Sequence, residues 1–236
     1  MKKVFFTLLA VAGIALAATA QENKTMYIMK KGVVTYTVPV SDIDSIIFYK
    51  PAAGVEINSV IWAICNVDAP GTFAAKPEDA GMFYQWNCKI GWSADNPMIN
   101  SNGDTMWNFS FPTGTLWEKD NDPSPAGWHV PTSAEIQKLL DTEKVSNVWT
   151  TENNVYGRKF TDITSRNSIF LPAVGHRYSH DGSLGHVGSL GSYWSSSQSE
   201  SSSFVYGLVF SNIKEADCTI FGGYNGFSVR SVADKN

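Results

Sequence analysis

The sequence is poor in charge, in cysteine and in long apolar runs. Its 236 residues include 18 Lys and Arg and 22 Asp and Glu, and the basic residues form no patch or run. Binding of nucleic acid needs a basic footprint, so we predict no nucleic acid among the partners. The three cysteines are an odd number, which leaves at least one thiol without a partner in the same chain. Cys65 ends an apolar run and is predicted to be buried, whereas pairing between Cys88 and Cys218 stays open.

The one long apolar run lies within the first twenty residues. Lys2 and Lys3 precede an apolar stretch over residues 4–18, and Ala18-Thr-Ala20 has the small-x-small pattern of a cleavage site. The stretch is short for a membrane span, and no cysteine follows it to carry a lipid. We therefore predict a signal peptide over residues 1–20, no membrane span, and a protein that is secreted or held at the cell surface.

Residues 21–54 are predicted to form a small β unit and a linker before a larger domain over residues 55–236. Residues 26–29 resemble a strand, Lys31-Gly32 predicts a turn, and residues 33–40 alternate with the period of a half-buried strand. The unit resembles a short β element of many exported Bacteroidetes proteins. Because two strands cannot bury a core by themselves, we expect this unit to pack on another surface.

The larger domain is predicted to be α+β, with two helices among short strands. Lys76-Pro77-Glu78-Asp79 has the residues of a helix start, and that helix is expected to end near Trp86. Thr132-Ser-Ala-Glu135 is a capping box before an apolar stripe and predicts the second helix. Strands are expected over residues 57–65, 169–174, 192–196, 204–210 and 227–232, and irregular structure over residues 88–122.

Four tryptophans, Trp86, Trp92, Trp107 and Trp117, fall in a region rich in Gly, Asn, Pro and Asp. Aromatic rings in loops provide contact area for sugars or proteins at low entropic cost. The same rings can instead fix a long irregular loop to the core, and we favour this role for most of them.

Four short motifs follow one another along the chain: Asp122-Pro-Ser-Pro-Ala-Gly-Trp-His-Val-Pro-Thr132, Ser168-Ile-Phe-Leu-Pro-Ala-Val-Gly-His-Arg177, Ser192-Tyr-Trp-Ser-Ser-Ser197 and Asn225-Gly-Phe-Ser-Val-Arg230. In order and spacing they resemble the Fibrobacter succinogenes major paralogous domain, a secreted module of the C-type-lectin-like superfamily. The resemblance covers about residues 55–234. It implies a C-type-lectin-like fold, in which two helices pack on twisted antiparallel strands and the ends of the domain lie close together.

The resemblance also implies roles for individual residues. Trp128, Trp194 and Phe227 match core positions of the family, and the loop over residues 177–191 matches the long loop with which relatives bind ligands. Relatives commonly carry cysteines where this chain has Ser124 and Ser231. The joint loss of both cysteines is what a disulfide between these two positions predicts.

We therefore expect a non-catalytic, exported binding or adhesion module that recognises a surface glycan or an envelope protein through loops. The predicted ligand-binding residues are Arg177, Tyr178, His180, Asp181 and His186 in the long loop, with Trp92 and Trp107 from the aromatic region. The alternative is a structural subunit of a surface assembly, in which the N-terminal β unit adds to the sheet edge of a partner.

Catalytic and metal-dependent readings have less support in the sequence. Formylglycine-generating oxidases of the same superfamily need two neighbouring thiols for copper, and only Cys218 stands near the matching end of this chain. His176, His180 and His186 would approach a zinc ion only if their loop folds back, and their spacing fits no fixed motif. The calcium-binding triplets of sugar-binding relatives do not occur, and no hydrolase signature can be assigned. We predict no enzymatic activity, no cofactor and no metal.

Overall fold

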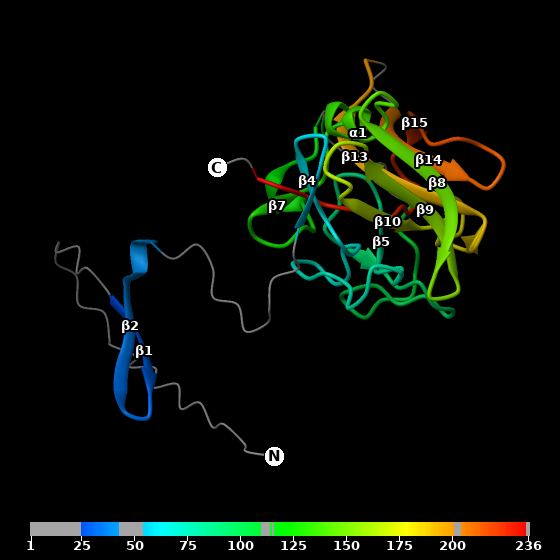
Figure 1. The fold of residues 1–236 in the computed structure, drawn as a ribbon. Helices are drawn as coiled ribbons and strands as arrows, with labels where there is room; N and C mark the ends of the chain where they lie inside the picture. The colour runs from blue at the N-terminus through cyan, green and yellow to red at the C-terminus, as the bar shows by residue number, and fades with distance from the viewer. Residues whose placement is uncertain (1–24, 43–53, 110–113, 115, 201–203, 235–236) are drawn as a thin grey trace. The chain divides into compact units, whose positions relative to one another are not determined.

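The computed structural model describes residues 25–42, 54–109, 114, 116–200 and 204–234 (Figure 1). The predicted signal peptide lies outside these residues. The chain divides into two compact units, one up to Ile46 and one from Ile47 onward. Each unit is described by itself below.

The first unit contains a β-hairpin, as the sequence predicts. Strand β1 (Thr25–Lys30) pairs antiparallel with β2 (Val33–Pro39), and a short 3-10 helix, η1 (Val40–Asp42), follows. Lys31 and Gly32 form the turn with positive φ angles of 52° and 79°. Apolar side chains lie exposed on both faces of the hairpin; they are Tyr27, Ile28, Met29, Val33, Val34 and Tyr36. Strands with apolar residues on both faces are typical of sheets that are covered on both sides.

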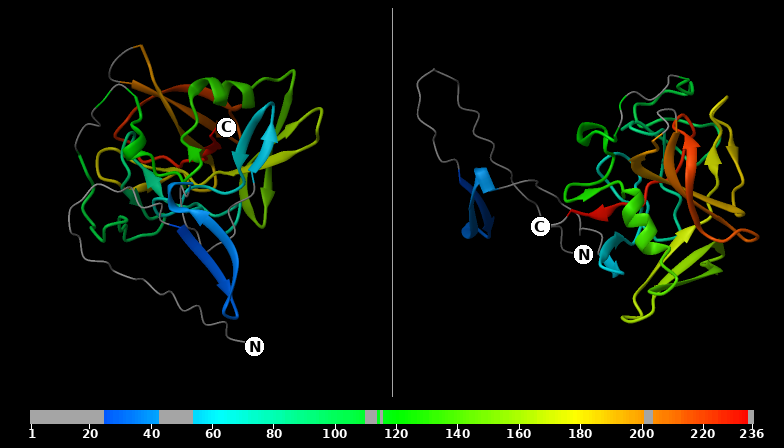
Figure 2. Two further views of the ribbon diagram at one scale, coloured as in Figure 1. Left: turned by 90° about the vertical axis from the view of Figure 1, so that its left-hand side faces the viewer. Right: turned by 90° about the horizontal axis from the view of Figure 1, so that it is seen from above.

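The second unit is built from small antiparallel sheets (Figures 1 and 2). One sheet has the order β3 (Gly54–Ile57), β4 (Val60–Ala63), β16 (Val232–Ala233) and β7 (Trp128–His129). Two three-stranded sheets consist of β10 (Ser168–Pro172), β9 (Val155–Asp162) and β8 (Val145–Glu152), and of β13 (Leu190–Gln198), β14 (Phe204–Ser211) and β15 (Asp217–Gly222). The remaining elements are the pair β5 (Phe83–Tyr84) and β6 (Gly91–Trp92), the pair β11 (His176–Arg177) and β12 (Leu184–Gly185), the 3-10 helix η2 (Lys119–Asn121) and the helix α1 (Ser133–Leu139).

The prediction of an α+β, C-type-lectin-like fold with two helices was wrong. The chain is β-rich, with 6% helix and 44% strand, and α1 is the one α-helix among the described residues. The helix expected after Lys76 does not form: the chain makes a single turn, in which the Asp79 amide donates to the Lys76 carbonyl oxygen at 3.2 Å, and no helix follows. Gly81 then takes a φ of +64°, in a place where a Cβ atom would lie 2.2 Å from the Val67 carbonyl oxygen.

Helix α1 confirms the predicted capping box. Thr132 accepts a hydrogen bond from the Glu135 amide, and Glu135 accepts one from the Thr132 amide. Ile136 and Leu139 point into the core, and the helix packs against β13, β14 and β15 (Figure 2). The capping residues thus give the chain its helix at the place that the sequence indicates.

Three of the five predicted strands form. Of the predicted strand over residues 227–232, only Val232 belongs to a strand, β16, and Phe227 and Ser228 form isolated bridges to Tyr84 and Tyr193. Strands β10, β13 and β14 match three of the predicted ranges, but residues 57–65 are interrupted by a turn at Asn58 and Ser59, both at positive φ. The hairpin β8–β9 was not predicted. Its turn residues Asn153 and Asn154 also have positive φ, which asparagine tolerates better than most residues.

The core consists of two clusters of buried side chains. One lies between the β8–β9–β10 sheet and the β13–β14–β15 sheet and includes Phe160, Leu171 and Phe210. The other gathers Trp86, Trp117, Trp194 and Phe227, with the rings of Trp194 and Phe227 stacked 4.2 Å apart. All four loop tryptophans of the aromatic region are buried, which confirms that they fix the irregular segment to the core.

The resemblance places Trp128 in the core, but the structure leaves it half-buried in β7, with its ring edge-on to Phe73. The three cysteines are free. Cys65 is buried as predicted, and burial raises the pKa of Cys218 to about 11.

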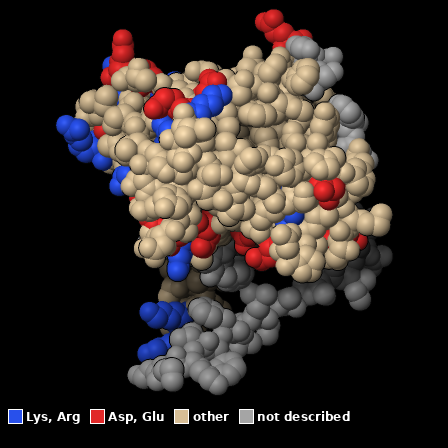
Figure 3. Space-filling view, turned by 90° about the vertical axis from the view of Figure 1, so that its right-hand side faces the viewer, with Lys and Arg blue, Asp and Glu red and all other residues tan. Residues whose placement is uncertain are grey.

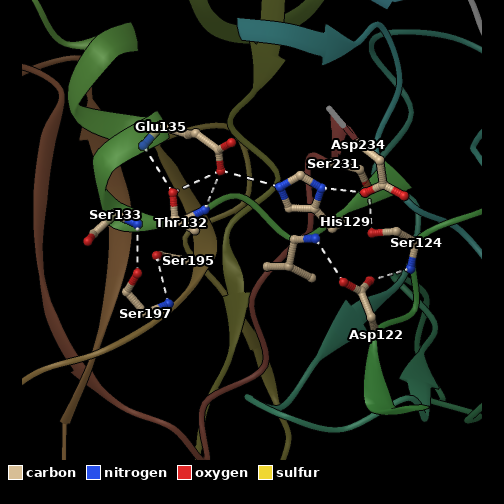
Figure 4. Close-up of polar contacts among 11 residues, drawn as sticks. Asp122, Ser124, His129, Thr132, Ser133, Glu135, Ser195, Ser197, Ser231 and Asp234 are labelled. Carbon is tan, nitrogen blue, oxygen red and sulfur yellow. Dashed lines mark hydrogen bonds and ion pairs between the residues drawn. The ribbon is translucent and has the colours of Figure 1, made fainter. Parts of the chain in front are cut away.

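Ser124 and Ser231 lie side by side, although they are 107 positions apart, and their hydroxyl oxygens are 2.7 Å from each other (Figure 4). We predict that the double variant Ser124→Cys, Ser231→Cys forms a disulfide on oxidation. A bridge over a loop of this length stabilises a fold by roughly 4–5 kcal/mol in the chain-entropy model. A thiol assay on the oxidised protein and urea unfolding measure the outcome.

The two single variants are the controls, and neither is expected to raise the unfolding midpoint. The native cysteines contribute three free thiols, so a bridged double variant shows three. Five free thiols after oxidation would mean that the two side chains do not meet in this geometry.

Candidate functional site

The predicted ligand-binding loop is a short hairpin that is tied to the centre of the larger unit. Strands β11 and β12 pair through His176 with Gly185 and Arg177 with Leu184. The amides of Arg177 and Gly226 each donate to the other residue's carbonyl oxygen, at 2.8 and 2.9 Å. Gly175, before β11, has a φ of +75°, and a Cβ atom there would lie 2.0 Å from the Gly185 carbonyl oxygen. The hairpin is therefore held by main-chain contacts that leave no room for a larger residue.

Arg177, which was predicted to contact ligand, is completely buried. Its Nε and Nη2 donate to the Ser93 carbonyl oxygen at 2.9 and 2.6 Å. Nη2 also donates to the Asp95 carbonyl oxygen at 2.7 Å, and Nη1 donates to the Gly182 carbonyl oxygen at 2.6 Å. Burial lowers the pKa of this guanidinium from its ordinary value. Arg177 thus joins the tip of the hairpin to the segment around Ser93, and its donors face main-chain oxygens instead of solvent.

Trp92 and Trp107 are buried as well. Their rings lie 5.0 Å apart, and the indole nitrogen of Trp107 donates to the Ser179 carbonyl oxygen at 3.1 Å. A Cβ atom on Gly182 would lie 2.7 Å from the Trp107 ring. Both tryptophans therefore support the hairpin from its inner side and offer no exposed face to a ligand.

The other predicted residues do come together at the surface. Tyr178 is half-buried, and His180, Asp181 and His186 are exposed. The Tyr178 ring lies 5.4 Å from His180 and 6.1 Å from His186, and the half-buried His176 lies 4.8 Å from Tyr178 and 5.4 Å from His186. We call His176, Tyr178, His180 and His186 the ring cluster. Three of its members, Tyr178, His180 and His186, are predicted ligand-binding residues, and a ligand can reach them from solvent.

The ring cluster is suited to stacking and hydrogen bonding. Burial, followed by the neighbouring His186, lowers the pKa of His176 to about 4, so this ring is neutral near pH 7. Asp181 accepts hydrogen bonds from the amide and hydroxyl of Ser183, which lower its pKa and fix its carboxylate. Within the described part of the chain, no group of three or more His, Cys, Asp or Glu is placed to hold a metal ion.

A second polar network surrounds His129 at the start of α1 (Figure 4). Its Nδ1 lies 2.7 Å from the carboxylate of Asp234, and its Nε2 lies 3.4 Å from that of Glu135. The hydrogen bond with Glu135 is the main cause that raises the pKa of His129, with a further contribution from Asp234. Burial alone would raise the pKa of Glu135, but the bonds from His129 and Thr132 lower it to about 2.

This network does not have the arrangement of a hydrolase triad. A general-base histidine holds a nucleophilic hydroxyl on one ring nitrogen and a carboxylate on the other, whereas both ring nitrogens of His129 face carboxylates. The nearby Ser124 and Ser231 bond to each other. The network joins the segment after β16 to the start of α1. Sequence reasoning missed the contact between His129 and Asp234, because no sequence signal connects residues 105 positions apart.

Charge is sparse on part of the surface. On the side where β15 lies in Figure 1, the space-filling view shows isolated acidic and basic side chains around a broad uncharged area (Figure 3). None of the helices in the described ranges has the length and apolarity needed to cross a membrane.

Comparisons of the chain with family models, with curated proteins and with solved structures find no match.

We predict that the His129 network makes stability depend on pH. The folded-state pKa of His129 is raised, so its contribution is complete below the unfolded value of about 6.5 and is lost as pH rises through the folded value. The pKa of Glu135 is lowered, so its contribution holds above about pH 4.3 and is lost as pH falls towards 2. His129→Gln should therefore cost roughly 1 kcal/mol at pH 5.5, as for a partly exposed ion pair, and less at pH 9.

Urea unfolding of the wild type and of His129→Gln at the two pH values measures this difference. His180→Gln is the control, since His180 is exposed outside the network. An equal loss of stability for His129→Gln at pH 5.5 and pH 9 would contradict the ionic role of His129.

Proposed function

We propose that the protein is an exported, non-catalytic binding module whose ring cluster recognises a surface glycan or an envelope protein. The observation that carries the proposal is the ring cluster itself, with His180 and His186 exposed and Tyr178 half-buried between them, on a hairpin fixed from beneath by Arg177 and Trp107. A binding site gains affinity when its contact residues are held in place before the ligand arrives. Buried supports under exposed rings supply that condition.

The chemistry of the ring cluster favours a ligand that stacks and forms hydrogen bonds. Tyrosine and histidine rings offer flat apolar faces together with polar edges. The nonpolar face of a sugar ring, or an aromatic or amide group of a protein, fits such a surface. The sparse charge in Figure 3 is consistent with a ligand recognised by shape and hydrogen bonds instead of by strong electrostatic attraction.

Export and the family resemblance remain part of the proposal. The predicted signal peptide supports an extracellular or cell-surface location. The close approach of Ser124 and Ser231 supports the matching of these two positions to the paired cysteines of the resembled family. The His129 arrangement, in which both nitrogens face carboxylates, gives no support to a catalytic alternative.

A structural role in a surface assembly is the second candidate function. Exposed apolar side chains on both faces of the β1–β2 hairpin favour it, since large exposed apolar areas mark interaction sites. A two-stranded hairpin also has unpaired main-chain groups at its edges, which suit addition to the sheet of a partner.

We predict that replacing Tyr178 and His180 by Ala abolishes binding on glycan and envelope-protein arrays. Tyr156→Ala is the matched control, because Tyr156 is an exposed aromatic residue outside the ring cluster. The melting temperature of the double variant should fall by only a few degrees, because an exposed residue such as His180 usually costs within about 0.5 kcal/mol and Tyr178 is only half-buried. Once a ligand is found, isothermal titration measures the affinity with and without EDTA.

Full affinity in the double variant would remove the ring cluster from the binding site, and loss of affinity in EDTA would require a metal. Deletion of residues 21–50 separates the two candidate functions. Binding without assembly in the deletion variant identifies the hairpin as the assembly element, whereas loss of ligand binding would place the site in the hairpin unit.

A further inference from the structure

A polar cavity of about 340 Å³ lies away from the ring cluster. It forms where the β3–β4 turn meets the β9–β10 turn and the residue before β8. Its lining residues are Glu56, Asn58, Ser59, Lys144, Asp162, Thr164, Ser165 and Asn167. The volume is near the lower end of the range for ligand pockets, roughly 300–1,000 Å³, so the cavity suits a small molecule.

The walls of the cavity are fixed by hydrogen bonds. The carboxylate of Asp162 accepts from the amides of Asn58 at 2.9 Å, Thr164 at 2.9 Å and Ser165 at 2.7 Å. These bonds lower the pKa of Asp162 to about 2 and connect the two turns. The Ile163 amide donates to the Lys144 carbonyl oxygen at 2.8 Å, which adds the third segment. Both carboxylate oxygens of Asp162 thus accept hydrogen bonds that fix the turns lining the cavity.

The side chains of Glu56 and Lys144 carry the free charges of the cavity. Within the described part of the chain, neither side chain has a hydrogen bond or an ion pair, and they do not reach each other within 4.0 Å. Asn58 and Asn167 donate their amide nitrogens to the carbonyl oxygens of Lys138 and Glu56, at 2.9 and 3.2 Å. Asn58, Asn167 and Glu56 all line the cavity, so amide oxygens and a carboxylate are among its acceptors. One wall therefore supplies acceptors with negative charge, and Lys144 supplies a cation.

We propose that this cavity binds a small zwitterion with an ammonium and a carboxylate group, as in a free α-amino acid. The ligand's carboxylate pairs with Lys144, and its ammonium donates to Glu56 and to the amide oxygens of Asn58 and Asn167. All of the described lining residues are polar, and none is aromatic. A neutral sugar thus finds no ring on which to stack, and the volume of about 340 Å³ limits the size of the side chain that the ligand can carry. The ligand is a small or polar amino acid.

The expected affinity is in the millimolar range, because both charged side chains are exposed and each ion pair is screened by solvent. Titration of isotope-labelled protein with glycine and with serine, followed by nuclear magnetic resonance, tests the proposal. Saturable shifts are expected at the amides of residues 56–59 and 162–167. Acetate, glycine methyl ester and glucose each lack part of the required chemistry and should bind at least tenfold more weakly.

Glu56→Gln and Lys144→Gln should each weaken glycine binding about tenfold or more, which corresponds to the loss of one charge-assisted contact. Lys138→Gln and Glu143→Gln are the matched controls, since both residues are exposed nearby and do not line the cavity. The Tyr178→Ala, His180→Ala variant should bind glycine as the wild type does, so this test is independent of the ring cluster. The absence of saturable shifts, equal shifts with acetate and glycine, or full affinity in both cavity variants would overturn the proposal.

Discussion

The main chain of residues 226–232 is the constraint on which the larger unit depends. Its amides and carbonyl oxygens bond to segments far apart in the sequence, among them Val67, Tyr84, Arg177, Ser192 and Trp194. The two-stranded pairs β5–β6 and β11–β12 are too small to be stable in isolation. The central segment forms hydrogen bonds with residues of β5, β11 and β13, and it thereby joins these elements into one folded unit.

Arg230 strengthens this central segment from within the core. Its guanidinium is buried and donates to the Asn66 side chain and to the carbonyl oxygens of Ala63, Ile64 and Pro77. A buried cation is costly unless its donors are satisfied, and here main-chain oxygens satisfy them. Because irregular segments have few sheet partners for their carbonyl groups, a buried arginine can stabilise them where strands cannot. Arg177 acts in the same way beneath the hairpin at the other end of the segment.

This arrangement explains how a binding surface is built on a loop without losing rigidity. The residue pair Arg177 and Gly226 joins the hairpin to the central segment, and Trp107 fills the space beneath its tip. The half-buried ring of Tyr178 and the exposed ring of His180 therefore extend from a backbone that is fixed on its inner side. The rigidity of such a site is closer to that of a site on a helix or strand than to that of a site on a free loop.

Local signals in the sequence predicted local structure well. The capping box at Thr132 and Glu135 specifies α1, and the alternation of residues 33–40 specifies β2, because both signals act within a few residues. The helix expected after Lys76 failed because the chain makes a single turn between Lys76 and Asp79 and then takes a positive φ at Gly81, which the signals of a helix start do not reveal. The turns at Asn58-Ser59 and Asn153-Asn154 were missed because their positive φ angles have no Gly to mark them.

The sequence predicted a polar surface loop over residues 177–191, and the structure has the β11–β12 hairpin there, with His180, Asp181 and His186 exposed. The sequence did not predict the burial of Arg177, because a surface arginine and a buried arginine have the same sequence signal. Arg177 is buried because main-chain oxygens from Ser93 and Asp95 surround it, and those segments are more than eighty positions away. The cavity lined by Glu56 and Lys144 also depends on contacts between turns that are distant in the sequence. No local sequence pattern therefore predicts it.

Ser124 and Ser231 show how the segment around β16 is held to the segment before β7. A disulfide at these positions would contribute roughly 4–5 kcal/mol by restricting the unfolded chain. The present contacts across the same junction are the serine hydrogen bond, the pairing of β7 with β16, and the ion pair of His129 with Asp234. Hydrogen bonds and exposed ion pairs contribute about 1 kcal/mol each, so together they approach the stabilisation of one disulfide. Unlike a disulfide, these contacts do not depend on the redox state, so their contribution to the stability of the fold is the same in a reducing medium. Unlike a disulfide, they depend on pH, because the ion pair is lost when His129 loses its proton.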